Sequence, residues 1–308
     1  MMRPVGRIVF SCFLEGLWKG CEGVHERDYA LFFHACEAVS AAILRRGNVV
    51  GDMADSQIKS RERVSKRGEV FTAKREVKAM LDLVKHETER LDSRFLEPAC
   101  GTGNFLEEIL LRKLDAATRA SIPDGKKTPI PAKFERNSIV VLTSIYGVDL
   151  MFDNVAECRE RLYEIWHKAY KKSCRRSVSE LVCDAAKVLL ARNIIQGNSL
   201  SMKKVDDCQN DLEDPIVFSE WSFIGEYRVK RTDYRLDKML AGKYKGADAK
   251  TRRHDVARPP RPCRKGEGAL ATASLALSSD TKQYDDEGDI ISEFPILPHY
   301  ARIAEYVG

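Results

Sequence analysis

The sequence predicts an α/β fold built on a doubly wound, mostly parallel sheet, and two observations carry this prediction. Short apolar segments rich in β-branched residues, at 145–150 and 194–196, each end in polar residues, and apolar positions at helical spacing lie between them. Strands that alternate with helices at such intervals favour a parallel sheet with helices on both faces.

The elements follow from their apolar periodicity. A helix is expected from Lys74 to Val84, because Val77, Met80, Leu81 and Val84 recur at helical spacing. The segments expected after it are a strand at 95–96, a glycine turn at 97–104, a helix over 105–114, a surface insertion at 115–137, an apolar β-branched segment at 139–142, a strand at 145–150, a helix over 155–166, a strand at 194–196 and a further strand at 216–218.

Composition excludes several classes of protein. Apolar residues make up 44% of the 308 residues, charged residues 31% and aromatic residues 8%, which excludes collagen-like, mucin-like and wholly disordered chains. No stretch approaches the ~20 apolar residues of a membrane span. Glu15 and Lys19 interrupt the apolar run that starts at Ile8, so it does not form a secretory leader. We therefore expect a cytoplasmic protein with no membrane partner.

The cysteines and histidines predict neither disulfides nor a metal site. The nine cysteines are odd in number and scattered, none forms a Cys-x-x-Cys pair, and the six histidines lie far apart. Reduced and mostly buried thiols are therefore expected.

Three regions are expected along the chain. Residues 1–52 form a helical N-terminal extension, with helical rhythm at 32–43; if Met53 is the true start, this region is an added segment. Residues 53–240 form the main domain. Residues 241–308 form a basic region of poor order. Within 228–265, fourteen Lys and Arg face four Asp, which is typical either of a surface for an anionic partner or of a solvated tail.

The turn at 97–104 carries the most chemical information. Gly101 and Gly103 permit close backbone approach where a strand feeds the N-terminus of a helix. A P-loop would require a following Gly-Lys-Ser/Thr, and a dinucleotide fingerprint would require a third glycine near Leu106; neither is present. A nucleoside without phosphates remains, with Asp149 at the end of the next strand to hold ribose hydroxyls. S-adenosylmethionine has this chemistry.

Four segments, in this order, resemble the cofactor motifs of the adenine-N6 DNA methyltransferases of restriction-modification systems. The resemblance implies a class I, Rossmann-like methyltransferase domain, S-adenosyl-L-methionine as cofactor and double-stranded DNA as partner. The segments are Gly68-Glu-Val-Phe-Thr72, Leu96-Glu-Pro-Ala-Cys-Gly-Thr-Gly-Asn-Phe-Leu106, Tyr146-Gly-Val-Asp149 and Gly197-Asn-Ser-Leu200.

The resemblance also assigns roles to residues. In that family the Phe-x-Thr-type segment approaches the methionine part of the cofactor, the glycine turn holds the cofactor body, and the acid after the second strand binds ribose. Asn198 replaces the Asp that usually bonds the adenine amine, and its carbonyl oxygen can still accept that hydrogen bond. The cofactor-binding residues implied are Phe71, Thr72, Glu97, Ala99, Gly101, Gly103, Asn104, Phe105, Asp149, Leu150 and Asn198.

The sequence departs from the family at the catalytic step. The family uses Asn/Asp-Pro-Pro-Tyr/Phe to hold the target amine and stack on the flipped base, and this chain has no such tetrapeptide. Asp214-Pro215 continues into Ile216 without a second proline. If 216–218 is the next strand, Trp221 lies where the catalytic loop belongs and either stacks on a base or packs in the core. Otherwise the loop belongs to a partner subunit or has been lost.

Three functions remain open at this point. The first is methyl transfer to adenine N6 in DNA, alone or with a partner chain. The second is a non-catalytic cofactor-binding subunit or truncated remnant, and the third is methylation of RNA or protein, since one fold serves many acceptors. Catalytic residues are unknown from the sequence.

Overall fold

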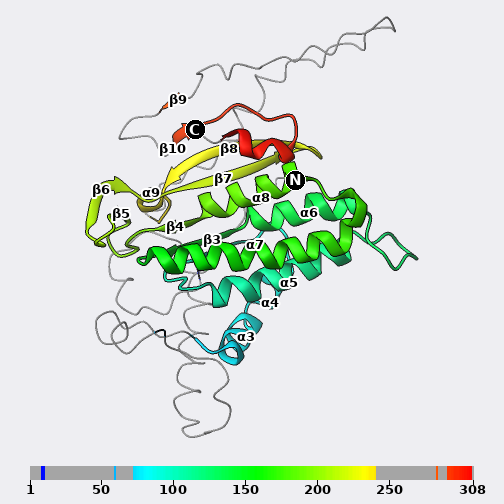
Figure 1. The fold of residues 1–308 in the computed structure, drawn as a ribbon, viewed down its shortest axis with the longest axis horizontal. Helices are drawn as coiled ribbons and strands as arrows, with labels where there is room; N and C mark the ends of the chain where they lie inside the picture. Colours follow the sequence, from blue (N-terminus) through cyan, green and yellow to red (C-terminus); the bar gives the residue numbers. More distant parts are fainter. Residues whose placement is uncertain (1–7, 11–58, 60–71, 241–281, 284–289, 307–308) are drawn as a thin grey trace, which may run out of the picture.

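A parallel sheet lies at the centre of the computed structural model, which describes residues 8–10, 59, 72–240, 282–283 and 290–306 (Figure 1). Its strand order is β1-β2-β3-β4, and each neighbouring pair is parallel. The mixed α/β class and the parallel sheet are thus confirmed. The strands are β1 (Ile8–Phe10), β2 (Arg94–Glu97), β3 (Ile145–Asp149) and β4 (Ile194–Gln196).

Helices form a layer on one face of this sheet (Figure 1). Phe95, Ile145 and Ile194 point from three strands into this layer, where they join a buried apolar cluster that contains Leu106 and Trp166. The expected helices over 74–84, 105–114 and 155–166 are all present. The helices are α3 (Lys74–Asp82), α4 (Lys85–Thr88), α5 (Asn104–Ala120), α6 (Pro131–Leu142), α7 (Phe152–Cys174), the 3-10 turn η2 (Arg175–Ser177) and α8 (Glu180–Asn193).

An antiparallel hairpin covers the other face, where the doubly wound prediction placed helices. Phe218 packs against Tyr146 with ring centroids 5.2 Å apart, and Ile216 and Leu236 join the same apolar cluster as Leu96. The hairpin belongs to a second sheet of order β7-β8-β10-β9. Its elements are β7 (Val217–Ile224), β8 (Arg228–Arg235), β9 (Lys282–Gln283) and β10 (Ile290–Glu293), with α9 (Leu236–Leu240) after β8; a separate hairpin joins β5 (Lys203–Val205) and β6 (Asp211–Pro215).

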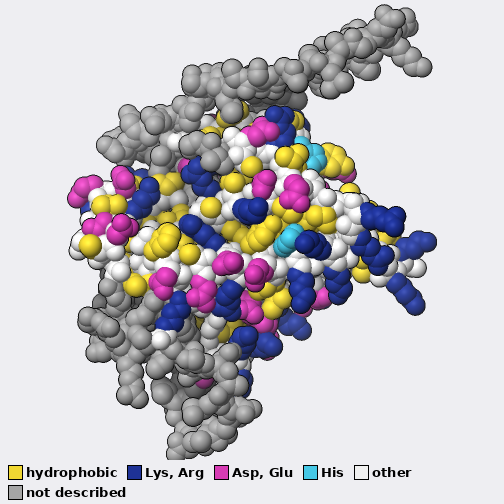
Figure 2. Space-filling model, in the orientation of Figure 1, with side chains coloured by type: hydrophobic (Ala, Val, Ile, Leu, Met, Phe, Trp, Pro, Cys, Tyr) yellow, Lys and Arg dark blue, Asp and Glu magenta, His cyan; other side chains and the backbone are white. Residues whose placement is uncertain are grey.

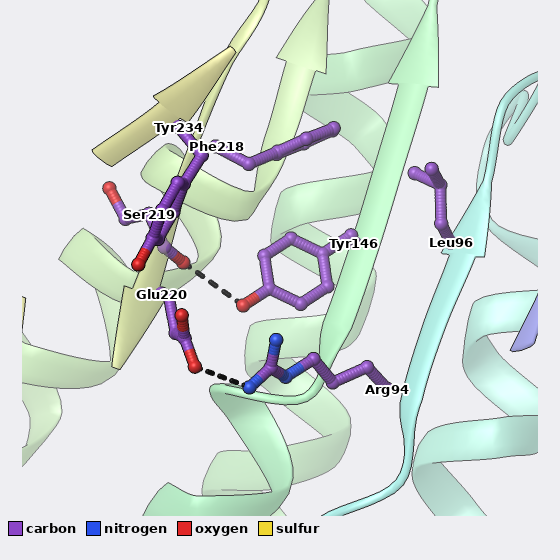
Figure 3. A pocket seen from close by; sticks show the side chains of 7 residues that line it. All are labelled: Arg94, Leu96, Tyr146, Phe218, Ser219, Glu220 and Tyr234. Atoms are coloured by element: carbon purple, nitrogen blue, oxygen red, sulfur yellow. Dashed lines mark hydrogen bonds and ion pairs between the residues drawn. The ribbon is translucent and has the colours of Figure 1, made fainter. Parts of the chain in front are cut away.

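Polar contacts fasten the hairpin to the parallel sheet, as Figure 3 shows. The Tyr146 hydroxyl donates to the Ser219 carbonyl oxygen at 3.0 Å, and the Arg94 guanidinium pairs with the Glu220 carboxylate at 2.5 Å. The cavity between these groups has a volume of about 20 Å³. This volume suffices for roughly one water molecule, so the cavity is part of the packing between sheets and too small for a nucleoside.

At four places the structure corrects or completes the expectations about the chain's organisation. The segment at 139–142 is the end of helix α6, because its apolar side chains pack among helices. The expected insertion at 115–137 is a connection of about ten residues, since α5 extends to Ala120 and α6 begins at Pro131. The strand at 216–218 exists but pairs antiparallel with β8. The N-terminal extension contributes β1, which pairs with β2, and its predicted helix at 32–43 lies outside the described residues.

The end of the chain is folded against the body, which corrects the expectation of poor order for residues 290–306. The 3-10 helix η4 (Tyr300–Tyr306) buries Tyr300, Ile303 and Tyr306 in the main core. The Tyr300 and Tyr170 hydroxyls both donate to the Glu135 carboxylate, at 2.8 and 2.5 Å, which ties η4 to α6 and α7. Residues 241–281 of the predicted basic region lie outside the described part.

A buried ion pair holds this C-terminal segment. The Arg231 side chain is 2% exposed; its Nε donates to Asp233 Oδ1 at 2.8 Å and its Nη2 to Oδ2 at 2.5 Å. Its Nη1 donates to the Tyr306 carbonyl oxygen at 3.0 Å, and the guanidinium lies 4.0 Å from the centre of the Phe294 ring. The cation therefore links β8 to the last described residues of the chain.

A lysine is buried beside the amino ends of β2 and β3. The Lys113 ammonium donates to the carbonyl oxygens of Leu91 and Ser93 and to the Ser144 hydroxyl, and it lies 5.2 Å from the centre of the Phe95 ring. Burial lowers the pKa of Lys113 to about 7.

Among the described helices, none combines the length and the apolar composition that a bilayer span requires.

Two Arg–Asp pairs, Arg231–Asp233 and Arg235–Asp237, have the same i, i+2 spacing and differ in burial. They provide a matched test of what burial contributes. Asp233→Ala is expected to lower the free energy of unfolding by about 3–5 kcal/mol, because it leaves the Arg231 cation buried without its carboxylate. Asp237→Ala breaks the pair with Arg235, whose side chains are 34% and 35% exposed, and should cost about 0–1 kcal/mol. Urea unfolding measures both; equal losses would contradict the role assigned to burial.

The Lys113 pKa predicts a pH dependence of stability. Between about pH 7 and 10, the unfolded lysine, with pKa about 10.4, binds more protons than the folded one, so its contribution to the free energy of unfolding rises with pH, by at most about 1.4 kcal/mol per pH unit. Lys113→Met removes this contribution. The difference between wild type and variant must be measured, because the raised pKa values of Cys100 and Cys174 act in the opposite direction. Identical pH profiles would refute the prediction.

Candidate functional site

The glycine turn lies at the carboxyl end of β2 and opens into helix α5. Gly101 and Gly103 have φ values of 51° and 92°, in the left-handed region that glycine adopts without a steric cost. The Gly103 N–H donates to the Cys100 carbonyl oxygen at 2.8 Å, and Gly103 is the N-cap of α5. The turn therefore presents the N-terminus of a 17-residue helix, which favours negative or electron-rich groups, at the edge of the sheet.

Asp149, at the end of β3, faces this turn. Its Oδ2 accepts a hydrogen bond from the Gly101 N–H at 2.9 Å, and its Oδ1 accepts from the Met151 N–H at 2.8 Å and the Asn154 amide at 3.1 Å. Three N–H donors thus fix the orientation of the carboxylate. The end of β3 and the glycine turn after β2 become one rigid unit.

Asn104 connects the turn to the segment before α3. Its amide donates to the Thr72 carbonyl oxygen at 3.1 Å, and its Oδ1 accepts from Arg161 at 3.1 Å. Arg161 also donates to the Thr102 carbonyl oxygen at 2.7 Å and forms an ion pair with Glu107. These contacts bring Thr72 to the start of α5, as the sequence motifs require.

A second carboxylate lies at the end of β2. Glu97 is buried, and its Oε1 accepts a hydrogen bond from the Ala99 N–H at 3.4 Å. The pKa of the Cys100 thiol is raised, first by its hydrogen bond with Cys158, then by burial, and further by the negative charges of Asp149 and Glu97. The negative charges of both carboxylates therefore reach the Cys100 thiol beneath the turn.

Close packing beneath the turn explains why two of the positions around it are glycine. A Cβ at Gly103 would lie 2.7 Å from Cys158 Sγ on α7, and a Cβ at Gly147 on β3 would lie 2.9 Å from the Leu106 side chain and 3.1 Å from Cys100 Sγ. Gly103 thus allows the turn to pack closely against α7. Gly101 has a different role, because its N–H donates to the Asp149 carboxylate.

The end of β4 lies beside the end of β3, and Asn198, the residue predicted to contact adenine, hydrogen-bonds to two other parts of the chain. The Gly197 N–H donates to the Asp149 carbonyl oxygen at 3.0 Å. The Asn198 amide donates to Asp211 Oδ1 on β6 at 2.9 Å, and its Oδ1 accepts from the Leu200 N–H at 3.0 Å. The Ser199 hydroxyl, rather than Asn198, contacts the glycine turn, through the Pro98 carbonyl oxygen.

The structure therefore gathers most of the predicted residues at one edge of the sheet. Phe105 packs against the main core, and the Leu150 carbonyl oxygen accepts from Gln196 at 3.3 Å, so each supports the edge from a neighbouring position. Phe71 lies outside the described residues. The predicted residues brought together are Thr72, Glu97, Ala99, Gly101, Gly103, Asn104 and Asp149.

Sequence reasoning missed the residues of α7 that support the turn. Asn154, Cys158 and Arg161 lie at i, i+4 and i+7, on the face of α7 that meets the glycine turn. Lys59 also reaches this helix, with Nζ 2.9 Å from Asn154 Oδ1 and 2.7 Å from the Glu157 carboxylate. The signal available in the sequence was polar and small residues at helical spacing within an otherwise apolar face.

The structure assigns Trp221 to the core, which is one of the two interpretations that the sequence left open. Its side chain is 6% exposed, its Nε1 donates to Asn193 Oδ1 at 3.3 Å, and its ring lies 6.0 Å from that of Tyr306. The preceding Ser219 and Glu220 contact the parallel sheet. This segment therefore works as packing between the hairpin and the helices.

The edge has a defined chemistry. Two carboxylates, Glu97 and Asp149, can accept hydrogen bonds from hydroxyl or ammonium groups, and the N-terminus of α5 attracts electron-rich groups. No three His, Cys, Asp or Glu side chains of the described residues are arranged to hold a metal ion. The arrangement is suited to a small organic ligand that carries hydroxyls and positive charge.

Comparison with known proteins identifies no relative: no protein-family model, no curated protein and no solved structure matches this chain. The interpretation of the edge therefore depends on the sequence motifs and on the contacts between the strand ends.

The packing of Gly103 can be tested against a glycine with a similar backbone conformation. Gly125 has φ 72°, and no atom lies within 4 Å of the position that a Cβ would take there, so Gly125→Ala should cost only the left-handed backbone, about 1–2 kcal/mol. Gly103→Ala should lower the free energy of unfolding further, because its Cβ meets Cys158 Sγ at 2.7 Å. Adding Cys158→Ala should recover part of that loss in a double-mutant cycle. Additive losses would contradict the contact.

Proposed function

We propose that the edge formed by the ends of β2, β3 and β4 binds S-adenosyl-L-methionine. The observation that carries the proposal is the hydrogen bond from the Gly101 N–H to Asp149, at 2.9 Å, which sets the ribose-binding acid of the motif directly against the glycine turn. Two segments 48 residues apart, selected from the sequence as cofactor motifs, are therefore in contact at the site where parallel sheets bind ligands.

The residues present fit the chemistry of this cofactor. Asp149 is suited to ribose hydroxyls, because a carboxylate accepts hydrogen bonds from both. Glu97 supplies a second negative charge for a ligand with cationic sulfonium and ammonium groups. Thr72 lies beside Asn104 at the start of α5, which suits the assignment of its segment to the methionine end.

We further propose that the chain serves methyl transfer to the N6 amino group of adenine in DNA, within a restriction-modification system. The cofactor supplies an activated methyl group; this chain orients it and excludes water at the strand ends. The catalytic tetrapeptide is absent from these 308 residues, so we place the group that holds the target adenine on a partner subunit. The parallel strands β2, β3 and β4 then correspond to the first three strands of a class I, Rossmann-like sheet.

A second candidate is a non-catalytic cofactor-binding subunit. The observation that favours it is the position of Trp221, which by motif order belongs to the catalytic loop and instead packs between the second sheet and α8. In this case the chain binds the cofactor without reaching a base. The two candidates share the cofactor site and differ in the reaction.

Replacement of Asp149 tests the cofactor site. Asp149→Asn is expected to weaken binding of S-adenosylmethionine by about 1–3 kcal/mol, roughly 5- to 150-fold, because one charged acceptor of the ribose hydroxyls is lost. Isothermal titration calorimetry measures the affinity. Asp153→Asn is the control, since Asp153 is half-exposed on the adjoining turn and pairs with Lys59. Unchanged affinity in a variant that melts as a folded protein would exclude the ribose assignment.

The same preparation separates the two candidates. The chain is incubated with the cofactor and unmethylated duplex DNA, and N6-methyladenine is measured by mass spectrometry. Methylation by the chain alone would establish the enzyme. Cofactor binding without methylation, followed by methylation when a chain carrying Asn-Pro-Pro-Tyr is added, would place catalysis on the partner; no methylation in either case favours the binding subunit.

A further inference from the structure

One end of the helix layer carries a concentration of cations that the proposed function does not use. Residues 168–176 contain Lys168, Lys171, Lys172, Arg175 and Arg176 without an acidic residue, and the neighbouring segment 126–133 adds three lysines. All eight of these side chains are exposed. Figure 2 shows dark blue side chains gathered at the right-hand end of the molecule, where these segments project beyond the sheet. We call residues 126–133 and 168–176 the basic end.

Helix packing places these cations on the surface and joins the two segments. Trp166, Tyr170 and Cys174 form the buried face of α7, and the lysines fall on the opposite side of the same turns. The Cys174 thiol donates to the Pro131 carbonyl oxygen at 3.5 Å, so the end of α7 lies beside the start of α6. The cations of both segments therefore lie on one continuous surface.

None of these cations is neutralised by a carboxylate of the described residues. In the described part of the chain, none of the eight forms an ion pair with a carboxylate, whereas Arg119, Lys187 and Arg302 each pair with an acid on their own helix. Exposed like charges repel one another. A cluster of this kind gains most from an anionic partner that is not part of the chain.

Arg175 provides a second observation. It ends α7 with φ 49° and ψ −107°, a conformation that glycine adopts without strain and that side chains rarely adopt. Its neighbours in the sequence, Cys174 and Arg176, do not have a positive φ. The chain keeps a guanidinium at the one position of the basic end where glycine would favour the fold.

We propose that the basic end binds the phosphate backbone of nucleic acid, without regard to sequence. The stripe from Lys168 to Arg175 extends about 10 Å along the helix, which spans about three phosphates of one DNA strand. Helix α7 has 23 residues and begins beside Asp149, so this surface lies about 30 Å from the cofactor edge and does not rest on the proposed function. A bilayer is less suited, because residues 168–177 expose no apolar anchor, although Ile130 is 47% exposed nearby.

Fluorescence anisotropy with a labelled 20-base-pair duplex of random sequence tests the proposal on the full chain. The variant carries Lys171→Gln, Lys172→Gln and Arg175→Gly. Its affinity is expected to fall at least about tenfold at 100 mM salt, and the slope of log K against log salt should decrease by about 2 to 3. The control carries Lys85→Gln, Arg119→Gln and Lys187→Gln, which remove the same charge from ion-paired positions and should leave the slope nearly unchanged.

The single variant Arg175→Gly separates binding from folding. It should raise the midpoint of urea unfolding, because the strain at this position is relieved, while it weakens duplex binding; a damaged fold would lower both. The proposal is overturned if the wild type fails to bind the duplex, if the control loses as much affinity as the variant, or if vesicles of phosphatidylserine and phosphatidylcholine bind where the duplex does not.

Discussion

The rest of the edge depends on the carboxylate of Asp149, which joins three parts of the chain. It accepts from the Gly101 N–H after β2, the Met151 N–H after β3 and the Asn154 amide on α7, while the Asp149 carbonyl oxygen accepts from the Gly197 N–H after β4. A single residue thereby fixes how three parallel strands end relative to one another. Because orientation at such an edge decides what a ligand meets, the same bonds that stabilise the fold also define the candidate site.

Two basic side chains, Arg231 and Lys113, are buried in this protein, and their partners differ in kind. Arg231 has a carboxylate, a backbone carbonyl and an aromatic ring as partners, and it holds the end of the chain. Lys113 has only neutral oxygen acceptors and a ring, and burial lowers its pKa. The contrast follows from the cost of desolvation, which a buried charge recovers fully only with an opposite charge nearby. The two buried cations are therefore held by different physical means.

Local periodicity predicted the elements of the first half of the domain and failed where packing partners decide the outcome. Val77 to Val84 and Val155 to Trp166 are amphipathic and form helices. The residues at 139–142 have strand propensity, yet they complete α6 because helices surround them on several sides. Ile216 to Phe218 was correctly predicted as extended, but no local signal shows that its partner is β8 in an antiparallel hairpin. Pairing depends on residues distant in sequence, which single-segment propensity does not include.

The sequence by itself determined the glycine turn, the acid after the following strand and their common edge, because a parallel sheet brings successive strand ends together. Only the tertiary structure decided that Asn198 turns to β6, that Trp221 is buried and that α7 supplies Asn154 and Arg161 beneath the turn. It also decided that the last described residues complete the core, since Tyr300 and Tyr306 find their partners across the fold. Backbone conformation and spacing are local properties, whereas the direction of a polar side chain depends on which donors and acceptors folding places beside it.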